Sequence, residues 1–206
     1  MIAIVDYGMG NLRSVENGLK AIGVEGKATS NPQDILSAKA VILPGVGAFK
    51  DCMANLEKFD LIDCVQKSAQ SGKPFLGICL GLQLLFSESE EFGSHAGLNI
   101  IPGKVKKFQF SEENRELKIP HMGWNQVKFQ TQSTLFEGVP DDSYFYFVHS
   151  YYVDPDDKNV VAATTNYGGD FVCGIRKDNV YAFQFHPEKS QKLGLTLLKN
   201  FSDLAN

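Results

Sequence analysis

The strongest constraint on the fold is an alternation of short apolar runs with helical patterns over about the first 90 residues. Residues 2–5 form the first β-branched run, and a helical pattern follows until Gly23 ends it. Asn31 and Pro32 have the character of a capped helix start. Further strands are predicted at residues 41–43 and 74–78, with helical patterns over residues 48–71. Because parallel strands need helical crossovers, this half predicts a parallel sheet with helices on both faces.

The second half of the chain has a different pattern, with several strand-like runs in close succession. These runs cover residues 103–110, 125–129, 144–153, 160–165 and 180–185. They suit antiparallel strands that extend the sheet or pack beside it, and residues 193–201 predict a final amphipathic helix. We therefore expect an α/β fold with a mostly parallel central sheet, flanking helices and additional antiparallel strands in the C-terminal half. No repeat or linker divides it, so a single domain is expected over residues 1–206.

Charge and cysteine usage narrow the functional classes. A formal net charge of -4 argues against broad binding to nucleic acid or to an anionic membrane. The chain begins without the features of a signal peptide and has no stretch long enough to span a membrane, so a cytoplasmic protein is expected. The four cysteines, Cys52, Cys64, Cys79 and Cys173, are widely separated, which predicts reduced thiols rather than a zinc site or disulfides.

The segment Gly77-Ile78-Cys79-Leu80-Gly81 lies where the third predicted strand turns into a predicted helix that continues to Phe86. It has the layout of a nucleophile elbow with cysteine in place of serine. Glycines two residues before and after the apex remove side chains that would clash in so tight a turn. The positive end of the helix would favour the thiolate form of Cys79. The alternative interpretation is a core cysteine in a glycine-rich turn.

A thiolate nucleophile needs a base, and His186 is the strongest candidate among the four histidines. It follows the strand predicted at residues 180–185, and Pro187 biases it toward an extended backbone. In an extended segment Glu188 projects to the same side as His186, so its carboxylate can orient the imidazole. The pattern therefore predicts a Cys79-His186-Glu188 triad. Read alone, His-Pro-Glu is an ordinary turn with an exposed carboxylate.

Acyl transfer also needs hydrogen-bond donors for the oxyanion that forms when sulfur attacks a carbonyl group. We expect the N–H of Leu80 to be one donor, because it directly follows the nucleophile. The second is expected from Val46 or Gly47, in a glycine-rich loop that leaves the second predicted strand. The same loop can equally be read as a simple turn.

Three motifs, in the same order along the chain, resemble those of the class I, triad-type glutamine amidotransferases: LPGVG at residues 43–47, GICLGLQ at 77–83 and FHPE at 185–188. Three further segments are similar, more narrowly, to the glutaminase subunits of imidazole glycerol phosphate synthases: DYGMGNL at residues 6–12, PHMGWN at 120–125 and YFYFVHSY at 144–151. The resemblance extends over essentially the full length. It implies a flavodoxin-like α/β fold.

The resemblance implies that the chain hydrolyses L-glutamine to glutamate and ammonia through a thioester on Cys79, with no cofactor or metal. The ammonia would pass to a (β/α)8-barrel cyclase subunit, the partner in a heterodimer, in histidine biosynthesis. The α-amino and carboxylate groups of glutamine would be held by Gly47, Gln83, Ser150 and Tyr151. The cyclase-facing surface would contain Asn11, Met122, Trp124, Tyr146 and Lys189. His121 and His149 are expected to be structural, because their spacing does not suggest a metal site.

Three alternatives remain open at the level of the sequence. A partner-independent cysteine hydrolase of the same fold, such as a peptidase or γ-glutamyl hydrolase, would use the same triad. A paralogous glutaminase could supply ammonia to another acceptor pathway, such as surface-sugar amination. A catalytically silent subunit could use the scaffold for assembly alone, although an intact triad argues against it.

Overall fold

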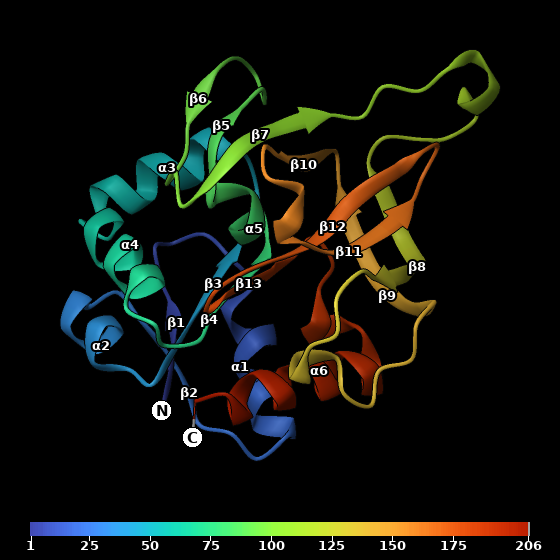
Figure 1. The fold of residues 1–206 in the computed structure, drawn as a ribbon. Coiled ribbons are helices and arrows are strands. Elements are labelled where there is room, and N and C mark those ends of the chain that lie inside the picture. The colour runs from blue at the N-terminus through green and yellow to red at the C-terminus, as the bar shows by residue number, and fades with distance from the viewer. Residues whose placement is uncertain (206) are drawn as a thin grey trace.

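The computed structural model describes residues 1–205 (Figure 1). The helices are α1 (Leu12–Ala21), α2 (Pro32–Ser37), α3 (Phe49–Lys58), α4 (Ile62–Gln70), α5 (Leu80–Leu84) and α6 (Gln191–Asp203). The strands are β1 (Ile2–Val5), β2 (Gly26–Thr29), β3 (Ala40–Gly45), β4 (Phe75–Cys79), β5 (Phe86–Ser89), β6 (His95–Ala96), β7 (Ile101–Lys107), β8 (His121–Phe129), β9 (Ser143–His149), β10 (Tyr151–Pro155), β11 (Val161–Asn166), β12 (Asp170–Lys177) and β13 (Val180–Phe183). The domain predicted over residues 1–206 includes Asn206, which lies outside the described residues.

The centre of the fold is a parallel sheet in the order β2-β1-β3-β4-β13. Successive side chains of β1 alternate between its two faces, so Ile2 and Ile4 pack in one core while Ala3 and Val5 pack in the other. Helices α1 and α6 cover the first face and α2 to α5 cover the second (Figure 1). This arrangement confirms the predicted parallel sheet with helices on both faces.

The C-terminal half adds antiparallel strands to this sheet, as predicted. β12 pairs antiparallel with β13, and β10 and β11 both pair with β12. β7 continues the sheet beyond β10, while β8 joins β11 and pairs with β9. Figure 1 shows β8, β9, β11 and β12 together on the side of the molecule away from α2 and α4.

Some element boundaries differ from the sequence-based prediction. The run predicted at residues 144–153 is two strands, β9 and β10, separated at Ser150. The helix expected to continue to Phe86 ends at Leu84, and Phe86 begins β5, which pairs with β7. The prediction did not single out β2, β6 or β12, because each becomes a strand through its pairing with a neighbour rather than through a long apolar run.

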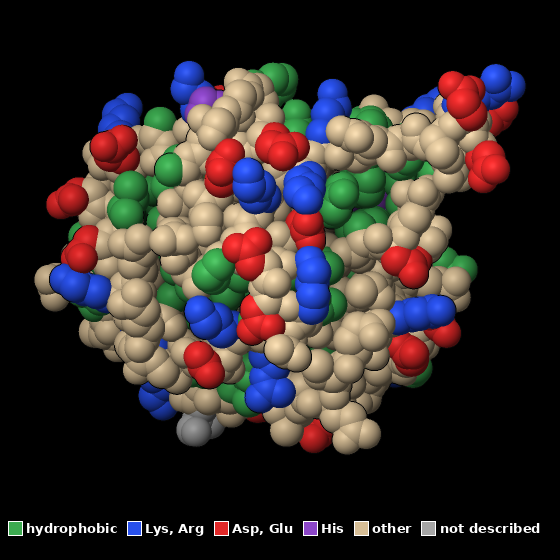
Figure 2. Space-filling model, turned by 45° about the horizontal axis from the view of Figure 1, so that its top comes forward, with side chains coloured by type: hydrophobic (Ala, Val, Ile, Leu, Met, Phe, Trp, Pro, Cys, Tyr) green, Lys and Arg blue, Asp and Glu red, His purple; other side chains and the backbone are tan. Residues whose placement is uncertain are grey.

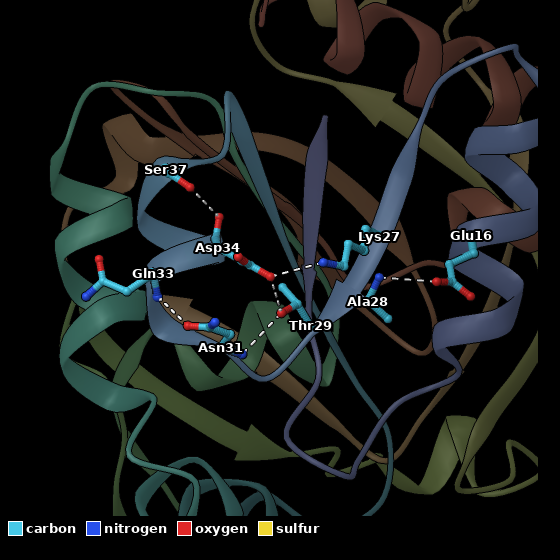
Figure 3. Close-up of polar contacts among 8 residues, drawn as sticks. All are labelled: Glu16, Lys27, Ala28, Thr29, Asn31, Gln33, Asp34 and Ser37. Atoms are coloured by element: carbon cyan, nitrogen blue, oxygen red, sulfur yellow. Dashed lines mark hydrogen bonds and ion pairs between the residues drawn. The ribbon is translucent and has the colours of Figure 1, made fainter.

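Polar contacts fix the edge strand β2 to helix α2 (Figure 3). The Asn31 side chain accepts a hydrogen bond from Gln33 N at 2.9 Å, which confirms the capped helix start. Asp34 Oδ2 accepts hydrogen bonds from Lys27 Nζ and from Thr29 Oγ1, each at 3.1 Å. These bonds to β2 lower the pKa of the Asp34 carboxyl group. The edge strand β2 is thus joined to α2 by hydrogen bonds to the charged carboxylate of Asp34.

On the face that Figure 2 shows, acidic and basic side chains are intermixed rather than gathered in one large patch. Figure 2 shows Lys and Arg side chains lying among Asp and Glu side chains over the visible face. Such mixing gives no broad field of one sign on this face. In the described part of the chain, no helix combines the length and the apolar character that a bilayer crossing requires.

The turn between β4 and α5 packs closely against both neighbouring strands, β3 and β13. A Cβ atom placed on Gly77 would lie 2.9 Å from the Cβ of Ala182, and one placed on Gly81 would overlap the carbonyl oxygen of Leu43. Both glycines therefore permit close approach, as their positions around Cys79 predict.

Replacing Gly81 with alanine should lower the free energy of unfolding by about 1–3 kcal/mol, because the added methyl group meets a backbone carbonyl that cannot rotate away. Urea unfolding of the purified variant measures the loss. Gly72→Ala is the control, since a Cβ at Gly72 meets no atom within 4 Å and adds only backbone strain from its positive φ. An equal or smaller loss for Gly81→Ala than for Gly72→Ala would contradict the tight packing of this turn.

Candidate active site

Cys79 is the last residue of β4 and directly precedes α5. Its backbone has φ 56° and ψ -113°, a conformation that non-glycine residues rarely adopt. Strained backbone of this kind persists only where the surrounding structure determines it, and it concentrates at functional sites. Cys79 as a whole is 7% exposed, and its side chain lines a cavity described below. The structure thus gives Cys79 the elbow geometry that the glycine pattern predicts.

His186 reaches the same edge of the sheet because β13 runs parallel to β4. Phe183 is in register with Ile78, so the residues that follow β13 lie beside the end of β4. His186 Nδ1 donates a hydrogen bond to Glu188 Oε1 at 2.8 Å, and both side chains are almost completely buried. Among the described residues, His186 Nε2 has no hydrogen-bond partner. The imidazole therefore has one nitrogen oriented by a carboxylate and the other free.

The environment of His186 favours its protonated form. Burial by itself lowers the pKa of the imidazole, but the neighbouring Cys79 sulfur and the Glu188 carboxylate, which accepts the Nδ1 hydrogen bond, oppose this effect. The net result raises the pKa of His186 to about 10. An imidazole next to a thiol in this state stabilises a negative sulfur, and it holds a proton that a departing group can take.

A cavity of about 310 Å³ opens at this edge of the sheet and contains Cys79 and His186 in its lining. Its remaining lining residues are Val46, Gly47, Leu80, Gln83, Glu91, Pro120, Val148, His149, Ser150, Tyr151 and Lys189. All the residues that the sequence singled out for the oxyanion and for glutamine binding therefore line one cavity. The described residues contain no group of three or more His, Cys, Asp or Glu side chains that could hold a metal ion.

Residues 3–204 match the family described as glutamine amidotransferase class-I. The chain belongs to this family. A curated relative from Syntrophotalea carbinolica is 53% identical over 206 residues, covering 99% of this chain and all of the relative. Another, from Aquifex aeolicus, is 52% identical over 199 residues, covering 96% and 94%. Both relatives are named imidazole glycerol phosphate synthase subunit HisH.

Solved structures share the fold of this amidotransferase at lower sequence identity. One, described as a glutamine amidotransferase, has a TM-score of 0.76 and 21% identity and covers 100% of this chain and 99% of its own. The structure of PurLQS from Thermotoga maritima has a TM-score of 0.73 and 17% identity, with coverage of 98% and 97%. At this identity the likeness concerns the fold, which is the predicted α/β class.

The residues predicted to face a partner come from β8, β9, the segment after β13 and the start of α1. Met122 and Trp124 are 65% and 45% exposed and project from the same side of β8. Tyr146 lies opposite Trp124 on β9, with ring centroids 6.1 Å apart, and Lys189 Nζ lies 6.0 Å from the centroid of the Tyr146 ring. Asn11 caps α1 instead, with its side chain accepting a hydrogen bond from Ser14 N at 3.3 Å.

The two histidines expected to be structural form a buried pair. His121 Nδ1 and His149 Nε2 are 2.9 Å apart, and His149 Nδ1 is 2.8 Å from Tyr151 O. Burial lowers the pKa of His121 to about 4 and the pKa of His149 to about 3. Both imidazoles are therefore neutral near pH 7, and His149 also contributes to the cavity wall.

Two polar residues of this site were missed by the sequence reasoning. Glu91 supplies the only carboxylate among the described residues that line the cavity, and its Oε2 also accepts a hydrogen bond from Phe49 N at 2.6 Å. Gln184 is fully buried, and its Nε2 lies 3.7 Å from Cys79 Sγ. The available signal for Gln184 was a single amide within the apolar run at residues 180–185. Glu91 had no such signal, because it lies among other acidic residues.

The Cys79→Ala variant should lower the pKa of His186 below its value of about 10, because burial is then opposed by Glu188 alone. A pH titration of the imidazole resonances by NMR measures this shift. Cys64→Ala is the control, since Cys64 lies on α4 and does not contribute to the pKa of His186. An unchanged His186 titration in Cys79→Ala would show that the thiol and imidazole are not coupled.

Proposed function

We propose that this chain is the glutaminase subunit of an imidazole glycerol phosphate synthase and releases ammonia from L-glutamine through a thioester on Cys79. The observation that carries the proposal is the cavity that contains Cys79 and His186, with His186 oriented by Glu188 at 2.8 Å. The names of relatives at about 50% identity over nearly the whole chain support the choice of pathway, which is histidine biosynthesis.

In the proposed mechanism His186 Nε2 takes the proton of the Cys79 thiol, and the sulfur attacks the side-chain carbonyl carbon of glutamine. The N–H groups of Leu80 and of Val46 or Gly47 would bind the oxyanion, because all three residues line the cavity. The carbon–nitrogen bond then breaks, and ammonia leaves with the proton from His186. Water adds to the thioester with His186 as base, which releases glutamate and restores the thiol.

The cavity also offers groups for the charged end of glutamine. Gln83 Nε2 donates to Tyr151 O at 3.1 Å and to Gln184 Oε1 at 3.0 Å, which leaves Gln83 Oε1 free to accept from the substrate. The Glu91 carboxylate is suited to pair with the α-ammonium group. Gly47, Ser150 and Tyr151 would complete the binding of the α-carboxylate.

Ammonia is useful to an acceptor only while it stays unprotonated, so it benefits from a route without bulk water. The proposed partner is a (β/α)8-barrel cyclase subunit that docks on the surface containing Asn11, Met122, Trp124, Tyr146 and Lys189. Exposed Met122 and Trp124 support this surface, because aromatic residues and methionine are enriched at protein interfaces. We further propose that the enzyme works in the cytoplasm, where a catalytic thiol stays reduced.

Cys79→Ala should abolish the synthesis that depends on glutamine but leave the synthesis that depends on added ammonia. The variant cannot form the thioester, whereas the acceptor site belongs to the partner. The measurement reconstitutes the native complex with the cyclase subunit and follows nitrogen from glutamine labelled at its amide. Loss of ammonia-dependent synthesis in the variant would contradict this division between subunits. Glutamine hydrolysis at the same rate with and without the cyclase would favour a partner-independent hydrolase.

Glu91→Gln should raise the KM for glutamine by about ten- to a hundredfold, because it removes one charge-assisted bond to the α-ammonium group. The kcat should change less, since Glu91 is not required for the proton transfers. Steady-state glutaminase kinetics of the reconstituted complex give both constants. Glu90→Gln is a suitable control because Glu90 is exposed and does not line the cavity. An unchanged KM in Glu91→Gln would remove Glu91 from the substrate site.

A further inference from the structure

Gln184 is a fully buried amide at the edge of the sheet where Cys79 lies. It follows β13 directly, and the register of β13 with β4 places it beside Cys79. Its backbone N–H donates to Cys173 O at 2.8 Å, which anchors the main chain at this point. A buried amide side chain is unfavourable unless its polar atoms find partners. The hydrogen-bond partners of the Gln184 side chain therefore indicate its role.

The side-chain contacts of Gln184 determine which way the amide points. Gln83 Nε2 lies 3.1 Å from Tyr151 O, and because a carbonyl can only accept, the Gln83 atom there must be nitrogen. The same nitrogen lies 3.0 Å from Gln184 Oε1, so that atom must be the acceptor oxygen. The remaining atom, Gln184 Nε2, then faces Cys79 Sγ at 3.7 Å as a donor.

The Tyr151 carbonyl, which orients the Gln83 amide, is fixed by a second hydrogen bond. Tyr151 O also accepts a hydrogen bond from His149 Nδ1 at 2.8 Å. His149 Nε2 then accepts from His121 Nδ1 at 2.9 Å, and Asn125 Nδ2 lies 3.2 Å from His121 Nε2. Each donor in this buried series of hydrogen bonds meets an acceptor. The orientation of the Gln184 amide is therefore fixed from β8 inward.

Val148 O, the other hydrogen-bond partner of Cys79 Sγ, can bond only to the protonated thiol. As a thiol, Cys79 donates weakly to Val148 O at 3.9 Å. Once the proton leaves, that carbonyl presents lone pairs to a negative sulfur, whereas the Gln184 N–H still donates to it. The neighbouring helix α5 has only five residues, so few aligned peptide dipoles contribute at this point.

We propose that Gln184 is a further catalytic residue that donates a hydrogen bond to the Cys79 thiolate, with Gln83 and Tyr151 O fixing its orientation. This inference rests on the proposed function, because it requires Cys79 to be the nucleophile. The hydrogen bond stabilises the sulfur whenever it is negative, both before attack on glutamine and when the thioester is hydrolysed.

Gln184→Met and Gln184→Glu test the donor directly. Methionine keeps a similar length without the donor, and glutamate keeps the shape and the contact with Gln83 but offers oxygen to the sulfur. The rate at which iodoacetamide alkylates Cys79 is followed against pH by mass spectrometry of the peptide. Thermal unfolding of each variant is measured in parallel. Gln66→Met is the matched control, since Gln66 donates to Leu98 O at 2.8 Å away from the cavity.

We expect the alkylation profile of both Gln184 variants to move to higher pH, and kcat/KM to fall by about ten- to a hundredfold, as the loss of one bond to a charged group predicts. Gln66→Met should keep the native profile even if it unfolds more readily. A folded Gln184 variant with the native alkylation profile and rate would overturn the proposal. A native profile in Gln184→Glu would assign Gln184 a packing role only.

A measurement on the native protein is independent of whether the variants fold. The side-chain amide resonances of Gln184 should shift with pH at the same midpoint as the alkylation of Cys79. Resonances that do not respond to the ionisation of Cys79 would overturn the proposal. Failure of the proposed function gives a different result, because a glutamine-analogue electrophile would then not label Cys79 in the native complex at all.

Discussion

The parallel pairing of β4 with β13 is the constraint on which the site depends. Because the two strands run in the same direction in register, their carboxyl ends meet at one edge of the sheet, and Cys79 comes to lie near His186. The loop after β3 reaches the same edge, since β3 pairs with β4 on the other side up to Gly45. Side chains that are far apart in the sequence thus meet through backbone hydrogen bonds alone. The break between β9 and β10 contributes Ser150 and Tyr151 to the wall of the cavity.

Each strand end contributes a different chemical function to the site. The end of β4 holds the thiol in a strained turn, and the segment after β13 supplies an imidazole, a carboxylate and a buried amide. The break between β9 and β10 turns the Tyr151 carbonyl toward two donors from separate elements. The amides of Gln83 and Gln184 and the His186–Glu188 pair cannot move without breaking a hydrogen bond to another group. Such prior order reduces the reorganisation that a charged transition state would otherwise require.

Much of this arrangement could be predicted from the sequence, for reasons that are local. The glycines around Cys79 and the Pro187 after His186 restrict the backbone within a few residues, so their chemistry was readable in the chain itself. Gln184 and Glu91 could not be assigned a role in the same way. The position of Gln184 beside Cys79 follows only from the pairing of β13 with β4. Glu91 is one of several acidic residues near the end of β5, and the sequence does not indicate which of them lines the cavity. Short strands such as β2 were missed because tertiary pairing, not composition, determines them.

The buried imidazole pair has a consequence for tolerance to acid. The pKa values of His121 and His149, about 4 and about 3, lie below the ordinary value for histidine. Between these values and about pH 6.5, the two imidazoles are therefore protonated in the unfolded chain but neutral in the folded chain. The stabilising effect of the neutral pair is complete above about pH 6.5 and is lost as the pH falls toward 4 and then 3. Protonation at low pH therefore destabilises the buried hydrogen bonds of His121 and His149, which connect β8 to the cavity.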